Sequence, residues 1–288
     1  MHRVRSARRP LVGATLIALI LGLVALSGIP AFAGGSSQRP VFRLPQSYYL
    51  ALGDSMAYGF QPTKKPGAPP AVFDTGYVDV FAARLRKLSP KIRVVNYGCP
   101  GESTVTFSRG GCPGFADGFK LHDPFSGPQL RAAESFLRAH RGQVSPITVT
   151  LWGGDLPLPL SRNAKQAPKA IASFGSRFSS VLEQLRAAAP TAEIIVTGAW
   201  NLEADRLVRA EPLYRSLDVV IRRAAAASRA RVANMFVALN GTGGVEAQKA
   251  RLCRLTFYCS KQDPHPTDAG YRAMADAFAA ASGYPRKP

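Results

Sequence analysis

Short apolar segments rich in β-branched and aromatic residues alternate with longer segments of helical periodicity along most of this 288-residue chain. Strand-like and helix-like segments come in turn at 47–52, 77–88, 92–97, 129–140, 147–152, 166–188, 193–199, 206–229, 231–239 and 267–282. Such an alternation is typical of a parallel sheet, because the chain must cross over one face of the sheet between parallel neighbours. The sequence therefore predicts an α/β fold of three layers, a central parallel sheet with helices on both faces.

The segments between these elements indicate where a site should lie. Residues 98–127 are rich in Gly, Cys and Pro and predict a long loop, which is usually functional inside a compact domain. Residues 61–72 hold four prolines and predict a second loop. Ligands bind beyond the carboxyl ends of the strands in an open parallel sheet, so we expect the chemistry there.

The N-terminal residues have the features of an export signal. Residues 1–10 are Arg-rich, residues 11–29 are almost wholly apolar, and residues 31–33 (Ala-Phe-Ala) provide a small-x-small cleavage pattern. An uncleaved anchor helix is the alternative, because about 19 apolar residues can just span a bilayer. We expect a signal peptide over 1–33 and a secreted or cell-envelope protein that touches the membrane only through this segment.

The remaining chain predicts a short linker and one domain. Residues 34–46 are rich in Gly, Ser, Gln and Pro and predict the linker, which leaves 47–288 as the domain. The composition, 46% hydrophobic and 19% charged, excludes an intrinsically disordered chain.

The net charge of the chain is +19, of which four arginines in the first 33 residues account for +4. The other Lys and Arg residues are scattered singly or in pairs, with no dense basic tract and no zinc-finger or RNP pattern. This distribution predicts a generally basic surface rather than a dedicated nucleic-acid site. No feature of the sequence determines the oligomeric state.

Four cysteines, Cys99, Cys112, Cys253 and Cys259, allow three disulfide pairings. Export into an oxidising compartment favours pairing, and the local pairs Cys99–Cys112 and Cys253–Cys259 would close short loops. Spacings of 13 and 6 differ from the C-x₂₋₄-C pairs of zinc sites, so we expect no metal.

Gly53-Asp54-Ser55 follows directly on the first predicted strand. A serine at a strand-to-helix turn can present its hydroxyl outward, and the glycine permits the tight turn. Asp and Ser are also preferred where helices begin, so the motif alone leaves a nucleophile and a helix cap as alternatives.

The segment 263–267 (Asp-Pro-His-Pro-Thr) precedes the last predicted helix. A general base needs a fixed mount and an orienting acceptor, which the two prolines and Asp263 would provide for His265. The alternative is a capping loop, with Thr267 as N-cap and a surface histidine. Of the other histidines, His122 lies in the long loop and could line a pocket, whereas His140 ends a helix.

Two glycine-rich segments follow the second and third predicted strands. Main-chain N–H groups in the first, residues 96–104 (NYGCPGEST), can form an oxyanion hole. Gly153-Gly154-Asp155 follows the third strand, where a polar donor could complete that hole. Both segments also fit plain turns, so the two interpretations stay open.

Taken in this order, the segments resemble the GDSL or SGNH hydrolase family over most of residues 47–282. Ser55 matches the nucleophile of the family, and Gly101, five residues after Asn96, matches its oxyanion glycine. The acid–x–x–His–Pro–Thr–x–x–Gly–Tyr pattern is matched closely, except for the spacing of the acid, by Asp263, His265, Pro266, Thr267, Gly270 and Tyr271. The resemblance implies the flavodoxin-like SGNH-hydrolase fold and looks most like the exported, actinobacterial-type esterases and lipases.

The resemblance also implies a mechanism, acyl transfer without a metal or organic cofactor. Ser55 would attack an ester carbonyl while His265, oriented by Asp263, takes its proton. Main-chain N–H groups of Ser55 and Gly101 would hold the oxyanion, and water would resolve the acyl-enzyme.

Two positions depart from the pattern of the family. Its third segment is usually Gly-x-Asn-Asp, and aligned on Asp155 the asparagine position holds Gly154, which has no side chain to donate. Loss of one such donor costs about 10²–10³ in turnover unless another group, such as Asn201 or Trp152, replaces it. The acid also stands two residues before His265 rather than the commoner three.

We therefore expect a small-molecule, lipid or glycan ester as substrate. The alternatives are a non-catalytic member that binds an acyl or glycan ligand, and a deacetylase or acyltransferase acting on polysaccharide. Several apolar loop residues either line an acyl pocket or only pack the core: Phe60, Phe107, Phe115, Leu156, Leu158 and Leu160.

Overall fold

The computed structural model describes residues 44–284. The signal peptide expected over 1–33 and all but the last three residues of the linker expected over 34–46 lie outside the described residues. The part of the chain that is described contains no helix long and apolar enough to cross a membrane.

Five parallel strands form one sheet in the order β2-β1-β3-β4-β5. Their bounds are Tyr48–Gly53 for β1, Arg93–Asn96 for β2, Val144–Thr150 for β3, Ile194–Thr197 for β4 and Arg231–Ala233 for β5. Strands β3 and β4 are buried along their whole length, as expected where helices cover both faces of a parallel sheet. The α/β fold with a central parallel sheet, predicted from the alternation, is confirmed.

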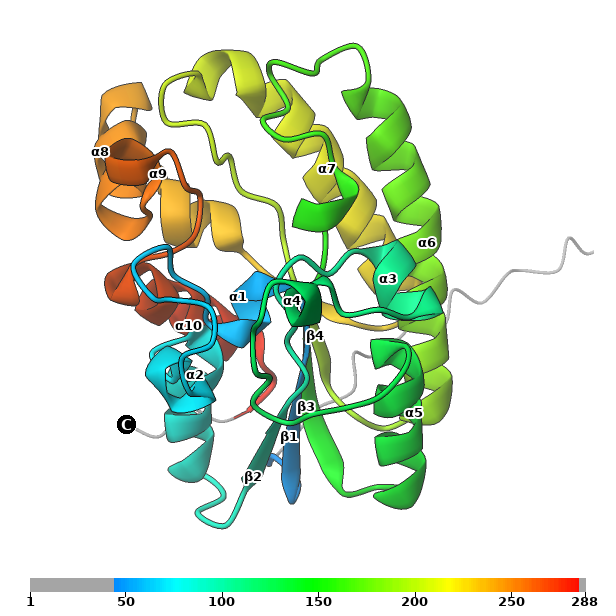
Figure 1. Ribbon diagram of the computed structural model, residues 1–288. Helices are drawn as coiled ribbons and strands as arrows, with labels where there is room; N and C mark the ends of the chain where they lie inside the picture. The colour runs from blue at the N-terminus through cyan, green and yellow to red at the C-terminus, as the bar shows by residue number, and fades with distance from the viewer. Residues whose placement is uncertain (1–43, 285–288) are drawn as a thin grey trace, which may run out of the picture. The chain divides into compact units, whose positions relative to one another are not determined.

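Helices cover the two faces of this sheet (Figure 1). The long ones are α2 (Tyr77–Arg86), α5 (Gln129–Ala139), α6 (Ala167–Ala188), α7 (Leu207–Ala227) and α10 (Asp268–Ala281). Helix α10 packs against α2, α6 packs against both α5 and α7, and the two groups flank the sheet on opposite sides. All five helices were expected from the sequence within one or two residues at each end.

The pairing of α2 with α10 shows how the apolar periodicity is used. Helix α2 buries Tyr77, Phe81 and Leu85, spaced four residues apart on one face. The ring of Tyr77 stacks on that of Phe278 of α10, with centroids 4.5 Å apart. Helix α10 begins where the Thr267 side chain accepts a hydrogen bond from the Gly270 N–H, which fixes the end of the preceding loop.

Two expectations for the connections were wrong in part. Residues 98–127 contain two short helices, α3 (Thr104–Arg109) and α4 (Pro113–Ala116). Helix α3 forms because Ser103 and Thr106 make a reciprocal capping box. The strand expected over 231–239 ends at Ala233, and residues Phe236–Asn240 (η3) form a π-helix instead.

The helix expected after the strand-to-helix turn at Ser55 is the short α1 (Ser55–Tyr58). Other elements were not expected: η1 (Pro70–Phe73), η2 (Gly153–Asp155), α8 (Val245–Leu255) and α9 (Tyr258–Lys261). Helix α8 was missed because it buries only Leu252 and Leu255 and shows little apolar periodicity.

Candidate active site

Ser55, His265 and Asp263 form one chain of hydrogen bonds at the carboxyl edge of the sheet. Ser55 Oγ lies 2.8 Å from Nε2 of His265, and Nδ1 of His265 lies 2.7 Å from Oδ1 of Asp263. Ser55 begins α1, just after β1, whereas Asp263 and His265 precede α10. Ser55 and His265 are 210 positions apart in the chain. The structure thus brings a hydroxyl, an imidazole and a carboxylate together in the order that general-base activation of a serine requires.

The loop that carries His265 is held at several points. Asp263 Oδ1 accepts not only the His265 ring but also the main-chain N–H of His265, at 2.8 Å. The carbonyl oxygen of His265 accepts from Phe257, and the Thr267 N–H donates to Leu255, each at 2.9 Å. The two-residue spacing between acid and base therefore lets a single carboxylate oxygen fix both the backbone and the ring of His265.

Asp263 is ionised more readily than an ordinary aspartate. Its partial burial opposes ionisation, but the hydrogen bonds from His265 and the charges of His265 and Lys261 outweigh this effect, so the pKa of Asp263 is lowered. A carboxylate that stays ionised can hold the imidazole N–H and stabilise the imidazolium that forms during reaction.

At the turn after β1 the helix cap is made by Asp54 and not by Ser55. Asp54 is the N-cap of α1, because its Oδ1 accepts from the Met56 N–H at 3.0 Å. Burial raises the pKa of Asp54 to about 6, against the opposing effect of the Met56 hydrogen bond. The cap is thus made by Asp54, and the hydroxyl of Ser55 is directed to His265.

Gln129, the first residue of α5, connects this turn to the loop after β2. Its Oε1 accepts from the Gly53 N–H at 2.7 Å, and its Nε2 donates to Gly53 O at 3.1 Å and to Glu102 Oε2 at 2.9 Å. Burial raises the pKa of the Glu102 carboxyl to about 7. Gln129 was not expected from the sequence, although a polar residue at the start of an amphipathic helix is a weak signal for such a contact.

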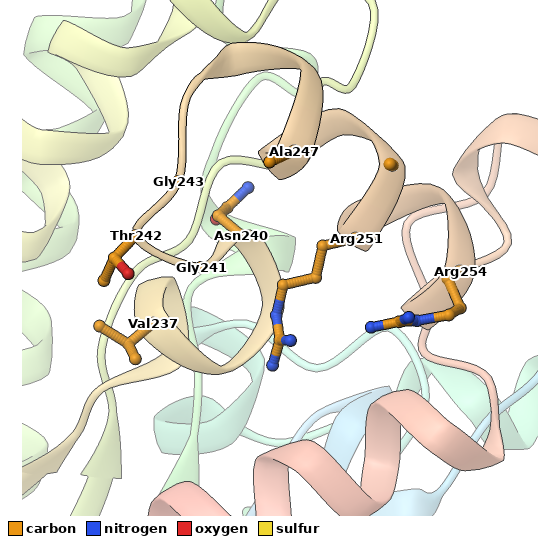
Figure 2. A pocket seen from close by; sticks show the side chains of 9 residues that line it. Val237, Asn240, Gly241, Thr242, Gly243, Ala247, Arg251 and Arg254 are labelled. Atoms are coloured by element: carbon orange, nitrogen blue, oxygen red, sulfur yellow. The ribbon is translucent and has the colours of Figure 1, made fainter.

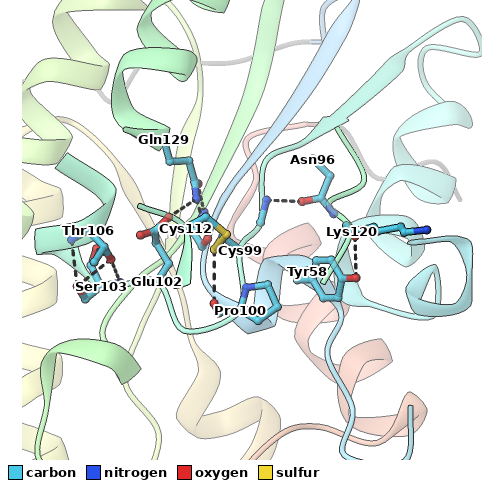
Figure 3. Close-up of a disulfide and its surroundings, with 12 residues drawn as sticks. Tyr58, Asn96, Cys99, Pro100, Glu102, Ser103, Thr106, Cys112, Lys120 and Gln129 are labelled. Carbon is cyan, nitrogen blue, oxygen red and sulfur yellow. Dashed lines mark hydrogen bonds between the residues drawn. A yellow bond between two sulfur atoms is a disulfide. The ribbon is translucent and has the colours of Figure 1, made fainter. Parts of the chain in front are cut away.

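Gly101 lies in the loop that the Cys99–Cys112 disulfide closes. The disulfide lies beside Pro100, with Gln129 reaching across to Glu102 (Figure 3). Gly101 has a φ of +81°, a conformation that glycine adopts without strain. The other disulfide joins Cys253 to Cys259, so both pairs are the local ones that the spacing favours.

Gly154 lies where the loop after β2 leaves no space for a side chain. A Cβ at this position would stand 2.5 Å from the carbonyl oxygen of Glu102 and 3.2 Å from Cβ of Ser103. The asparagine usual in related proteins therefore does not fit here without movement of the 102–103 segment.

Several main-chain N–H groups around Ser55 have no hydrogen-bond acceptor within residues 44–284. They belong to Ser55, Gly101, Gly153 and Gly154, which all line the same pocket. Asn201, considered as a replacement donor, is turned away: its Nδ2 donates to Leu207 O at 2.9 Å and its Oδ1 accepts from Glu203. Trp152, the other candidate, lies in the pocket wall.

The pocket that contains Ser55 and His265 has a volume of about 340 Å³. Its apolar wall comes from the ends of four strands and the following loops: Met56, Phe60, Pro100, Phe119, Trp152, Leu158, Trp200 and Leu202. Phe60 lies edge-on to the His265 ring, with centroids 4.5 Å apart. This is a preformed apolar site with the Ser55 hydroxyl at one point in its wall.

Only two of the six apolar loop residues considered for an acyl pocket line it. Phe60 and Leu158 do, whereas Phe107, Leu156 and Leu160 are buried in the core and Phe115 is exposed. His122 is not in the pocket wall, because its ring contacts the carbonyl oxygen of Tyr58 and the carboxylate of Asp74. Trp200 and Leu202 were missed, although their place just after β4 is the position where site residues were expected.

A second hollow, of about 520 Å³, lies between η3 and α8 (Figure 2). Arg251 and Arg254 are the charged side chains at its wall, and the described residues that line it include no His, Cys, Asp or Glu. It offers no base and no carboxylate, whereas the pocket at the strand ends holds the Ser55 hydroxyl against the His265 ring, so the latter is the candidate active site.

Comparisons with known proteins agree with the α/β fold described above. A model of the GDSL-like lipase/acylhydrolase family matches residues 51–273. A lipase from a goat rumen metagenome is similar in structure, with a TM-score of 0.56, 19% identity and coverage of 81% of this chain and 96% of that one. A phospholipase A1 from Streptomyces albidoflavus has a TM-score of 0.56 at 17% identity, with coverage of 82% of this chain and 100% of that one. An acetylxylan esterase from Geobacillus stearothermophilus has a TM-score of 0.54 at 14% identity, with coverage of 84% of this chain and 96% of that one. A comparison with curated protein sequences gives no match.

Proposed function

Since the chain belongs to the GDSL-like lipase/acylhydrolase family and is a serine hydrolase of esters, we propose that it cleaves carboxylic esters through an acyl-enzyme on Ser55. The observation that carries this proposal is the 2.8 Å contact between Ser55 Oγ and Nε2 of His265, with Asp263 behind the imidazole. The family resemblance seen in the sequence is confirmed; the roles given to single residues are our proposal.

The first half of the reaction forms the acyl-enzyme. Ser55 Oγ bonds to the ester carbonyl carbon while its proton passes to Nε2 of His265, and the carbonyl oxygen becomes an oxyanion. When the tetrahedral intermediate collapses, the bond to the alcohol oxygen breaks and His265 returns the proton to that oxygen. Water then repeats the sequence on the acyl-enzyme, with His265 as base, and releases the acid and Ser55.

We assign the oxyanion hole to main-chain donors. Ser55, Gly101 and Gly154 line the pocket and their N–H groups have no acceptors in the described structure, and Gly153 adds a fourth such group. Backbone donors of this kind stabilise developing negative charge at no cost in reorganisation during the reaction. The Gly154 N–H then replaces the side-chain amide that related proteins place at this position.

The pocket favours an apolar acyl group of short to medium length. Its volume of about 340 Å³ lies near the lower end of the range of about 300–1,000 Å³ typical of ligand sites. Aromatic and aliphatic side chains dominate its wall, so burial of acyl methylenes supplies the binding free energy. We expect kcat/KM to rise from acetate to butyrate and hexanoate esters and to fall for long chains.

We also propose that the protein is exported, with cleavage after Ala33 and residues 34–46 as a linker. The two disulfides support this proposal, because such bonds persist in oxidising compartments. N-terminal sequencing of the protein from an expressing culture tests it. Mature protein in the medium would begin at Gly34, whereas an anchored protein would retain residues 1–33 and sediment with membranes.

Hydrolysis of p-nitrophenyl esters from acetate to decanoate, beside the Ser55→Ala variant, tests the function. We expect serine-dependent turnover, and labelling by a fluorophosphonate that Ser55→Ala abolishes. Folded, disulfide-intact protein that binds but does not turn over these esters would instead support the non-catalytic alternative. Turnover confined to acetylated polysaccharide, or enhanced by an added alcohol acceptor, would support the deacetylase or acyltransferase alternative.

A further inference from the structure

Arg177, on α6, lies outside the pocket but contacts both segments that carry the proposed oxyanion donors. Its Nε donates to Thr104 Oγ1 at 2.8 Å, and its Nη2 donates to Asp155 Oδ1 at 2.9 Å. Thr104 begins α3, after the loop that follows β2, and Asp155 ends η2, after β3. One guanidinium therefore connects two loops that belong to neighbouring crossovers of the sheet.

The carboxylate of Asp155 is the centre of these contacts. Its side chain is fully buried, and it accepts from the Thr104 N–H at 2.8 Å and from the Thr104 hydroxyl at 2.5 Å. Removal of Arg177 would leave this buried charge with neutral partners only, which is costly in a low-dielectric environment. Hydrogen bonds to ionised groups are about twice as strong as neutral ones, so the three residues form a stiff unit.

The unit has one residue close in sequence to each of two proposed oxyanion donors. Asp155 directly follows Gly154, and Thr104 is three residues after Gly101. Between them Gly154 packs against the carbonyl oxygen of Glu102, with no room for a Cβ. The contacts between Thr104 and Asp155 thus hold together the two segments that contain Gly101 and Gly154.

We propose that Arg177 is a positioning residue for catalysis: through Asp155 and Thr104 it fixes the spacing of the main-chain donors that hold the oxyanion. This inference rests on the proposed function, because the donors matter only where an oxyanion forms. A misplacement of reacting or stabilising groups by about 1 Å can cost up to about 10² in rate. Loss of Arg177 should therefore affect the transition state far more than substrate binding, which the apolar wall provides.

Arg186, on the same helix, provides a matched control. It donates to the carbonyl oxygens of Ser228, Ala189 and Ala192 near the carboxyl end of α6, where it touches no residue of the pocket. Arg186→Met removes more hydrogen bonds from α6 than Arg177→Met does, because Arg186 also donates to the carbonyl oxygens of Pro190 and Arg229. It reports what the loss of a structural arginine does to stability alone.

The test measures kcat and KM of p-nitrophenyl butyrate hydrolysis for wild type, Arg177→Met, Arg177→Lys and Arg186→Met, well below each unfolding midpoint. We expect Arg177→Met to lower kcat by about 10–100-fold with KM within about twofold of wild type. The inhibition constant of an aryl boronic acid, which forms a tetrahedral adduct with serine, should rise by a similar factor. Arg177→Lys should recover part of the loss, because one charged donor can still reach Asp155.

Arg186→Met should lower the unfolding midpoint but leave kcat unchanged. If Arg177→Met kept wild-type kcat and boronate affinity, or lost activity only in proportion to its unfolded fraction, the positioning role would be wrong while the proposed function stood. Wild-type protein without serine-dependent turnover would overturn both. The two failures are therefore distinguishable in a single set of assays.

Discussion

Gly154 packs so closely under the carbonyl oxygen of Glu102 that a Cβ at position 154 would lie 2.5 Å from that oxygen. The absence of a side chain at this position is therefore a condition for the loops after β2 and β3 to meet. We therefore expect the donor at position 154 to be the main-chain N–H, because this packing leaves no room for a side chain there. The glycine at position 154 and the hydrogen-bonded unit of Arg177, Asp155 and Thr104 act on the same contact between the loops after β2 and β3.

The first prediction concerns this contact. Gly154→Asn restores the residue usual in related proteins, yet we expect it to lower kcat by at least about 10²-fold, because the new side chain displaces Glu102 and the neighbouring Gly101. Unfolding in denaturant should show a loss of about 1–3 kcal/mol. Gly244→Ala is the control, because a Cβ there meets open space and φ is −64°. A Gly154→Asn variant with raised kcat would show that the segment yields and that the asparagine amide is the better donor.

The second prediction concerns Asp263. Asp263→Asn should lower kcat by about 10⁴-fold with little change in KM, because an amide no longer holds the imidazole in the tautomer that accepts the Ser55 proton. Steady-state kinetics with p-nitrophenyl butyrate measures the change. The control is Asp276→Asn, an exposed aspartate of α10 paired with Arg84, for which kcat should stay at the wild-type value. A small effect at Asp263 would mean that another group orients His265.

The third prediction is a pH dependence of stability from Glu102. Its folded pKa of about 7 lies above the ordinary value of 4.5, so the stability that its protonated form contributes is fully present below about pH 4.5 and is lost as the pH rises through 7. Glu102→Gln keeps the hydrogen-bonding shape and cannot ionise. The free energy of unfolding of Glu102→Gln relative to wild type should therefore rise by about 1–3 kcal/mol between about pH 4 and pH 8.

Denaturant unfolding of both proteins at the two pH values measures this difference, and Glu246→Gln at the exposed start of α8 is the matched control. A difference that does not change with pH would show that Glu102 has the same pKa in the folded and unfolded chains.

The fourth prediction concerns the disulfide that encloses Gly101. The Cys99→Ala/Cys112→Ala double variant opens a loop of 13 residues and should lose about 3 kcal/mol of stability. Because the Gly101 N–H is a proposed oxyanion donor, kcat should also fall at temperatures where the variant is fully folded. Thermal unfolding and kinetics of the same samples measure both effects.

For the matched double variant at Cys253 and Cys259, a loop of 6 residues, the expected loss is about 2 kcal/mol. This disulfide lies beside the loop of His265, so its loss should lower kcat only by displacing the His265 side chain. The effect should therefore disappear in a variant that lacks this side chain and uses added imidazole as the base. Chemical rescue of a His265→Ala variant by imidazole is then insensitive to the 253–259 bond but still sensitive to the 99–112 bond. Equal sensitivity to both bonds would contradict separate roles for the two disulfides.

Much of the architecture follows from local pattern. The alternation of short apolar segments with amphipathic ones predicted the parallel sheet and its five long helices, because hydrophobic periodicity reports which face of each segment is buried. The errors fall where a local hydrogen-bonding device overrides the pattern. Ser103 and Thr106 start a helix inside the expected loop 98–127, and the chain leaves β5 at Ala233 to form a π-helix.

The sequence alone also singled out Ser55, His265 and Asp263, since residue type, order and placement at a strand end or before the last helix are local properties. The surroundings of these three residues depend on how distant segments pack: Gln129 bonds to Gly53, Arg177 bonds to both Asp155 and Thr104, and Trp200 lies in the pocket wall. These contacts join residues 22 to 76 positions apart, and their partners are chosen by how helices and loops pack on the sheet. Periodicity and propensity act within a few residues, so they place a glycine at position 154 in a turn but cannot show that a neighbouring loop leaves it no room for a side chain.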